Sequence, residues 1–152
     1  RAGVLMMFIR RAWWVPILLL LLSACGSPEW LDQHGNSVKR DALNGHRVVV
    51  NYWAQWCAPC RAELPELNRL SKNFPEARII GIDFDGATGD ALLAASEEMG
   101  IEFAVLGQDF AADMGLEKPK VLPTTYILDE QGEVLQTLHG PQSYEDIAAL
   151  LK

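Results

Sequence analysis

A Cys-x-x-Cys pair directly after an apolar run constrains this chain more than any other feature. The run Val48–Trp53 has the continuous apolar character of a strand buried on both faces, and it leads straight to Cys57 and Cys60. A helical pattern over 62–70 follows, which places Cys57 at a helix N-terminus. Unpaired backbone N–H groups and the helix dipole favour a thiolate there, and a thiolate is the species that attacks disulfides. The pair therefore predicts electron exchange through one reversible disulfide.

The N-terminal segment has the pattern of a secretory signal. Basic Arg10-Arg11 precedes an apolar stretch over 12–22, and small residues then lead to Cys25. The four residues 22–25 (Leu-Ser-Ala-Cys) resemble a bacterial lipobox, in which the chain is cut before the cysteine and the sulfur is lipidated. We expect a lipoprotein signal peptide at 1–24, a lipidated Cys25 with a tether at 25–29, and one domain at 30–152.

Two other interpretations of this segment stay open. An ordinary signal peptide would be cut near the same place without a lipid. An uncleaved anchor over Ala12–Pro28 would be uncharged for 17 residues, slightly under the usual length of a spanning helix. A twin-arginine signal fits the following Ala-Trp-Trp poorly. Met6 and Met7 are the expected translation starts, and the sequence does not distinguish the inner from the outer membrane.

The charge of the chain argues against nucleic acid as a partner. The formal net charge is −7, and three of the 13 basic residues lie in the leader while all 20 acidic residues follow it. Phosphate binding needs a basic face, which an acidic domain does not offer. A hydrophobic content of 49% supports a core that needs no disulfide scaffold, and the length suits one domain, expected to be a monomer.

The order of predicted elements indicates an α/β fold. A hairpin turning at Gly35-Asn36 comes first, and a buried strand, helices and further strands then alternate to a closing β-hairpin and a last helix capped by Ser143. This order predicts a mixed sheet flanked by helices, with the closing hairpin as antiparallel edge strands. The predicted strands after Val48–Trp53 are 77–84, 102–106, 123–128 and 133–138, and the predicted helices are 60–73 (kinked at Pro65), 90–99 (with Asp90 as N-cap and Gly100 as its end), 110–114 and the segment after Ser143.

Three separated features together resemble the thioredoxin superfamily: the Cys57/Cys60 pair, Pro65 within the next helix, and the distant Leu122-Pro123-Thr124. Within the superfamily, the segment 51–65 looks like the exported, membrane-tethered reductases of the TlpA/ResA/DsbE type. The resemblance covers about residues 29–151 and implies a thioredoxin-like fold with an N-terminal β-hairpin.

The resemblance also implies roles for individual residues. Cys57 matches the attacking cysteine of the family, Cys60 the resolving one, and Pro123 a cis-proline that faces the disulfide. The residue before that proline can pair its backbone with a substrate strand. The residues expected to bind substrate are Trp56, Ala58, Pro59, Leu122 and Pro123.

One position departs from cytosolic thioredoxin. Asn51 stands where that protein has a buried Asp under its disulfide, and Asn does not titrate in this pH range. Glu63, one helical turn after Cys60, matches the acidic residue near the disulfide in the TlpA/ResA type. We expect Glu63 to accept the proton that Cys60 loses before it attacks the mixed disulfide. The alternative is a solvated Glu63 in the first helical turn.

The function implied is that of a protein-disulfide reductase facing the periplasm. It would need no cofactor beyond the Cys57–Cys60 disulfide, and because the periplasm is oxidising it would need an upstream dithiol donor in the membrane. The Ala58-Pro59 dipeptide lacks a His that would strongly favour the thiolate, and the family resemblance points to reduction. A disulfide oxidase, an isomerase and a non-catalytic binding module remain alternatives. The disulfide-containing substrate stays open between an apocytochrome, as in cytochrome c maturation, another oxidoreductase and a damaged thiol.

Other polar and aromatic residues have simpler interpretations. The Cys pair could be half a zinc site, but His34, His46 and His139 form no paired motif, so no metal is expected. His139 is expected to end a strand. The remaining expectations are Trp53 in the core, Asp83 and Asp85 as solvated turn residues, and Arg61 exposed or stabilising the Cys57 thiolate.

Overall fold

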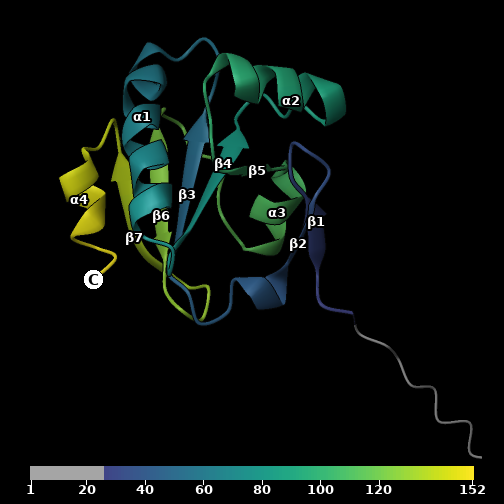
Figure 1. The fold of residues 1–152 in the computed structure, drawn as a ribbon, viewed down its shortest axis with the longest axis vertical. Helices are drawn as coiled ribbons and strands as arrows, with labels where there is room; N and C mark the ends of the chain where they lie inside the picture. The colour runs from purple at the N-terminus through teal and green to yellow at the C-terminus, as the bar shows by residue number, and fades with distance from the viewer. Residues whose placement is uncertain (1–25) are drawn as a thin grey trace, which may run out of the picture.

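The computed structural model describes residues 26–152 (Figure 1). The predicted signal peptide and the lipidated Cys25 lie outside the described residues. The predicted tether lies partly within them, and it contacts the domain: the Pro28 carbonyl accepts a hydrogen bond from the Arg40 N–H at 2.9 Å. Within 26–152 no helix combines the length and apolar character needed to cross a membrane.

The strands and helices follow the predicted order. The strands are β1 (Glu29–Leu31), β2 (Ser37–Lys39), β3 (Val48–Trp53), β4 (Arg78–Asp83), β5 (Ala104–Leu106), β6 (Thr124–Leu128) and β7 (Val134–His139). The helices are the 3-10 turn η1 (Arg40–Ala42), α1 (Ala58–Asn73), α2 (Gly89–Glu98), α3 (Gln108–Asp113) and α4 (Tyr144–Ala148).

The central sheet has five strands in the order β5-β4-β3-β6-β7. β3 pairs with β4 in parallel and with β6 antiparallel, so the sheet is mixed as predicted. The closing hairpin does not supply two edge strands, however. Because β6 pairs with β3 as well as β7, it lies inside the sheet and only β7 forms the edge. β1 and β2 form a separate two-stranded hairpin.

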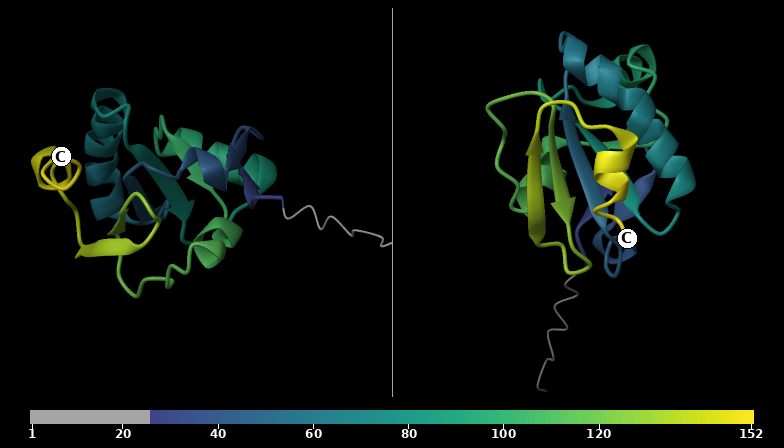
Figure 2. Two further views of the ribbon diagram at one scale, coloured as in Figure 1. Left: turned by 90° about the horizontal axis from the view of Figure 1, so that it is seen from below. Right: turned by 90° about the vertical axis from the view of Figure 1, so that its left-hand side faces the viewer.

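Alternate residues of β3 build two cores on the two faces of the sheet. Val49 and Trp53 pack with α1, α2 and α4, while Val48, Val50 and Tyr52 pack with α3 and the N-terminal hairpin. Figure 2 shows α4 beside α1 on one side of the sheet. Asn51 shares the face of Val49 and Trp53, so its side chain enters the core under α1.

The two edges of the sheet differ. At the β5 edge, the buried Gln33 side chain accepts a hydrogen bond from the Val105 N–H at 2.7 Å and donates to the Phe103 carbonyl at 2.9 Å. The Gln33 amide thus makes the two hydrogen bonds that a neighbouring strand would make at this point of the edge. The β7 edge is exposed along nearly its whole length.

All the predicted helices are present, but the residues at which they begin were predicted less accurately. α1 begins at Ala58, two residues before the predicted start, because Cys57 acts as its N-cap and Pro59 is tolerated in the first turn. The predicted N-cap Asp90 is wrong: Thr88 occupies that position and Asp90 lies in the first turn of α2. Ser143 does cap α4, in a reciprocal capping box with Asp146.

Candidate active site

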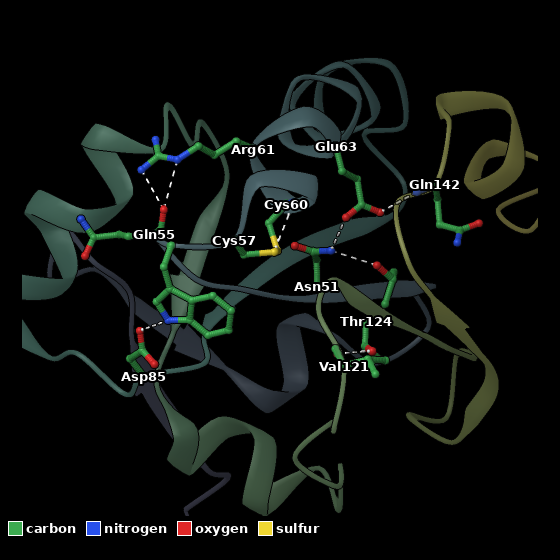
Figure 3. Close-up of a disulfide and its surroundings, with 12 residues drawn as sticks. Asn51, Gln55, Cys57, Cys60, Arg61, Glu63, Asp85, Val121, Thr124 and Gln142 are labelled. Atoms are coloured by element: carbon green, nitrogen blue, oxygen red, sulfur yellow. Dashed lines mark hydrogen bonds between the residues drawn. A yellow bond between two sulfur atoms is a disulfide. The ribbon is translucent and has the colours of Figure 1, made fainter.

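The sequence brings its two cysteines to the point where the central strand ends and α1 begins (Figure 3). Cys57 and Cys60 form a disulfide with a sulfur–sulfur distance of 2.09 Å. The Cys57 sulfur also accepts a hydrogen bond from the Cys60 backbone N–H at 3.3 Å. One free N–H group of the helix start therefore donates to the Cys57 sulfur, in line with the predicted position of Cys57 at a helix N-terminus.

The two sulfurs have different surroundings. Cys57 is 4% exposed and its neighbours Trp56, Ala58 and Pro59 are all exposed, whereas Cys60, in the first turn of α1, is fully buried. A bulky protein disulfide can approach Cys57 only. The geometry suits attack through Cys57 and a second, internal step through Cys60.

Polar contacts at the surface hold the segment beside Cys57. The Trp56 ring, 65% exposed, donates its Nε1–H to Asp85 at 2.9 Å and meets the Phe84 ring edge-on. Arg61 donates to the Gln55 carbonyl at 2.9 and 3.1 Å and pairs with Glu98, so it braces this segment and is exposed as expected.

The proline loop reaches the same end of the sheet from a distant part of the sequence. The Leu122–Pro123 peptide bond is cis, which confirms the expectation from the family resemblance. Thr124 follows it and pairs with Tyr52 near the end of β3, which leads to the cysteines. The Thr124 hydroxyl donates to the Val121 carbonyl at 2.8 Å and fixes the loop (Figure 3).

A hollow of about 780 Å³ lies beside this loop. Its walls include Lys118, Val121, Tyr126, Val134 and His139. The hollow adjoins the loop that carries Pro123 and the exposed edge strand β7. It therefore extends the exposed surface on which another chain could lie.

Glu63 lies on the buried side of the disulfide. It is 2% exposed, which excludes the solvated alternative. Its carboxylate accepts hydrogen bonds from the Asn51 side chain at 3.0 Å and from the Gln142 backbone N–H at 3.1 Å. Burial raises the pKa of the Glu63 carboxyl to about 7, and these two hydrogen bonds lower it only in part. Such a group can take up and release a proton near neutral pH.

Asn51 joins Glu63 to the neighbouring strand. Its amide nitrogen donates to Glu63 and also to the Thr125 hydroxyl on β6 at 2.9 Å. The position occupied by an Asp in cytosolic thioredoxin thus touches the acid that stands on α1 in this chain. Asn51 and Glu63 could each be singled out from the sequence, but this contact and the Gln142 donor could not, because 79 residues separate Gln142 from Glu63.

The residues with simpler interpretations fall largely as expected. Trp53 is fully buried, and His139 ends β7 with its Nδ1 3.2 Å from the Thr124 hydroxyl. The prediction that Asp83 is a solvated turn residue is wrong. Asp83 is 5% exposed, and its carboxylate accepts hydrogen bonds from the N–H groups of Asp85 and Ala87 in the following turn. Across residues 26–152, no three His, Cys, Asp or Glu side chains are grouped to hold a metal ion.

Comparison with known proteins agrees with this geometry. Residues 24–137 match the AhpC/TSA family. The chain is 31% identical over 126 residues to the thiol-disulfide oxidoreductase ResA of Bacillus thuringiensis, across 80% of this chain and 70% of that protein. It is 40% identical over 102 residues to the thiol:disulfide interchange protein DsbE homolog of Paracoccus denitrificans, across 64% of this chain and 53% of that one.

Solved structures share the fold. A thiol:disulfide interchange protein of the thioredoxin family from Chlorobium tepidum superposes with a TM-score of 0.69 at 22% identity, over 83% of this chain and 91% of that one. StoA from Bacillus subtilis superposes with a TM-score of 0.65 at 18% identity, over 83% and 98%. At these identities the likeness concerns the fold alone.

Proposed function

The chain belongs to the AhpC/TSA family of thioredoxin-like proteins and is a thiol–disulfide oxidoreductase, and we propose that it reduces disulfides of other exported proteins while tethered to a membrane. The observation that carries the proposal is the unequal environment of the two sulfurs. Cys57 stands at the start of α1 among exposed neighbours, and Cys60 is fully buried one helical turn before the buried Glu63.

The proposed reaction has two steps. The Cys57 thiolate attacks a substrate disulfide, forms a mixed disulfide and releases one substrate thiolate. Cys60 then loses its proton and attacks the Cys57 sulfur, which releases the second substrate thiolate and leaves the Cys57–Cys60 disulfide. A donor dithiol reduces this disulfide again and is itself oxidised.

Glu63 is proposed as the proton acceptor for the second step. Cys60 is fully buried, so solvent does not readily take its proton. Glu63 lies one helical turn away in the same interior, and its pKa of about 7 suits a base that works near neutral pH. The two groups that touch its carboxylate, the Asn51 amide and the Gln142 backbone N–H, carry no charge.

The surface around Cys57 is proposed to receive the substrate. Trp56, Ala58 and Pro59 flank the sulfur on one side, and the loop of Leu122 and Pro123 lies at the same end of the sheet. An extended substrate segment could pair with the Leu122 backbone and continue into the hollow beside β7. The DsbE-like name of one relative supports a protein substrate.

Turnover tests this function. The chain should catalyse reduction of insulin disulfides by dithiothreitol, and Cys57→Ser should abolish the catalysis. Cys60→Ser should instead accumulate a mixed disulfide, since the attack remains and the resolving thiol is missing. Failure of the wild-type chain to accelerate the reaction would refute the proposal. Faster oxidation of a reduced, unfolded protein than reduction of insulin would establish the oxidase alternative.

The membrane tether is proposed through a lipid on Cys25, after removal of residues 1–24 as a signal peptide. It rests on the pattern of residues 10–25. The chain produced in a bacterial host should incorporate labelled fatty acid and sediment with membranes, and Cys25→Ala should lose the label. Persistence of the label in Cys25→Ala would exclude this lipid site, and release of an unlabelled, shortened protein would indicate an ordinary signal peptide.

A further inference from the structure

The Asn51 carbonyl oxygen lacks a partner in the oxidised protein. Asn51 is fully buried, and its Oδ1 has no hydrogen-bond partner among residues 26–152. Buried polar groups are normally paired, because leaving one unpaired forfeits its hydration without compensation. An unpaired carbonyl next to a redox-active pair therefore needs a physical reason.

The orientation of the amide is determined by its other end. The Asn51 nitrogen lies 3.0 Å from the Glu63 carboxylate and 2.9 Å from the Thr125 hydroxyl. Above pH 7 the Glu63 carboxylate is ionised and only accepts hydrogen bonds, so the nitrogen faces Glu63 and the oxygen faces the other way. Figure 3 shows that this oxygen points toward the Cys57–Cys60 disulfide. A disulfide has no hydrogen to donate, whereas a reduced cysteine has one.

We propose that Asn51 is a positioning residue of the reduced protein, whose Oδ1 accepts a hydrogen bond from the Cys60 thiol. This inference rests on the proposed dithiol–disulfide function. A donor dithiol that opens the bridge breaks the sulfur–sulfur bond, delivers two electrons and two protons, and leaves as a disulfide. One of these protons forms the Cys60 S–H group that the carbonyl then accepts.

Two consequences follow for the reaction. Reduction supplies a partner to a group that the oxidised state leaves unpaired, so Asn51 shifts the equilibrium toward the dithiol. A hydrogen bond from the neutral thiol also favours the protonated form of Cys60. Asn51 therefore keeps Cys60 protonated while Cys57 attacks, and its nitrogen holds the Glu63 carboxylate that later takes the proton.

The equilibrium with glutathione tests this inference. The chain would carry Cys25→Ala, so that only Cys57 and Cys60 exchange, and would be equilibrated at pH 8, where Glu63 is ionised. Asn51→Leu removes the carbonyl at similar volume. It should make reduction about tenfold less favourable, which corresponds to a potential about 30 mV more negative. The matched control is Thr125→Val, which removes the other contact of the Asn51 nitrogen and leaves Oδ1 intact, and it should stay within twofold of wild type.

A second measurement separates this role from simple packing. In urea, a packing defect would destabilise the oxidised and reduced forms equally, whereas Asn51→Leu should destabilise the reduced form more by the same tenfold factor. If Asn51→Leu does not fold, the infrared S–H stretch decides. In Cys25→Ala/Cys57→Ser, the single Cys60 thiol should absorb at the lower frequency of a hydrogen-bonded S–H.

An unchanged potential in Asn51→Leu, an equal loss of stability in both forms, or a free S–H band would each overturn the inference. The proposed function would survive these results, because wild-type turnover is measured separately. A wild-type chain that does not exchange with glutathione at all would instead refute the function itself.

Discussion

The two sides of the disulfide differ in almost every physical respect. On the outer side, Cys57 adjoins exposed residues and a 65% exposed tryptophan, and the polar contacts there are made at the surface. On the inner side, Cys60 is enclosed with Asn51 and Glu63, which are 0% and 2% exposed. The Cys57–Cys60 disulfide thus lies between an exposed surface, where another protein can bind, and a buried group of side chains that includes a titratable carboxyl.

This difference suits the two steps of the proposed disulfide exchange. Attack requires access and a stabilised thiolate, which the start of α1 offers to Cys57. Resolution requires deprotonation of a thiol that water does not reach, which calls for a base within the core. We propose Glu63 for this role, because burial raises the pKa of its carboxyl to about 7.

The largest expected contrast between the two sides is in alkylation by iodoacetamide. In the reduced chain with Cys25→Ala, Cys57 should react on the order of 100-fold faster than Cys60 at mildly acidic pH, because the thiolate fraction and access set the rate. Mass spectrometry of Cys25→Ala/Cys57→Ser and Cys25→Ala/Cys60→Ser, each with one thiol remaining, measures the two rates. Equal rates, or a faster Cys60, would remove the assigned order of attack.

The interior can be probed through the pH dependence of stability. The pKa of Glu63 is about 7 in the folded protein against an ordinary 4.5, so between these values the folded protein holds a proton that the unfolded chain releases. Wild-type stability should therefore fall as pH rises from 4.5 to 7, by on the order of 2–3 kcal/mol, and then level off. Urea unfolding at several pH values measures this fall.

Glu63→Gln should abolish this contribution, since Gln does not titrate. The control is Glu97→Gln on α2, where the side chain is exposed and the wild-type fall should remain. A fall of the same size in Glu63→Gln would show that another group is responsible.

A substitution in the core tests packing alone, without any titratable group. A Cβ at Gly81 would lie 2.9 Å from the Trp53 indole nitrogen, closer than real Cβ contacts, and at a tight 3.2 Å from the Phe103 ring. Gly81→Ala should therefore destabilise both redox forms equally, by about 1–3 kcal/mol. The control is Ala94→Gly on the exposed face of α2, with an expected loss of about 1 kcal/mol from helix propensity alone. An unaltered melting temperature in Gly81→Ala would show that the sheet relaxes at this point.

The smallest predicted effect concerns the outer side. Trp56→Ala removes the contacts with Asp85 and Phe84, which lie at the surface, so stability should change by less than about 0.5 kcal/mol. The attack on a protein disulfide should slow by about tenfold, the equivalent of about 1.4 kcal/mol of lost contact, and the attack on a small disulfide should not. Equal slowing with both substrates would mean that Trp56 acts on Cys57 and not on the partner protein. Trp56→Phe, which keeps a ring against Phe84, is the intermediate control.

The sequence could predict elements and their order because these depend on local patterns. The apolar run of β3, the glycine after α2 and the Ser143 cap are each visible within a few residues. The active-site cysteines and the proline loop were visible because their motifs resemble a known superfamily.

Contacts between distant segments could not be predicted in the same way. Gln33 closes the β5 edge 72 residues from Val105, and no local pattern indicates that partner. The position of Asp83 after a strand predicts a solvated turn residue, but its carboxylate accepts hydrogen bonds from backbone N–H groups of the following turn. The pair of Asn51 and Glu63 belongs to this class, since the hydrogen bond that joins them depends on how α1 lies across β3.

The most direct test of the division between the two sides is the pH profile of each step in a single turnover. Reduced wild type, Glu63→Gln and Asn51→Asp would be mixed with a disulfide substrate between pH 5 and pH 9, with formation and resolution of the mixed disulfide followed separately. Resolution by wild type should rise with ionisation of Glu63 near pH 7. Glu63→Gln should lose this rise and resolve about 100-fold more slowly, while its first attack stays unchanged, and Asn51→Asp should add a new titration. Identical profiles for both steps in wild type and Glu63→Gln would contradict the account.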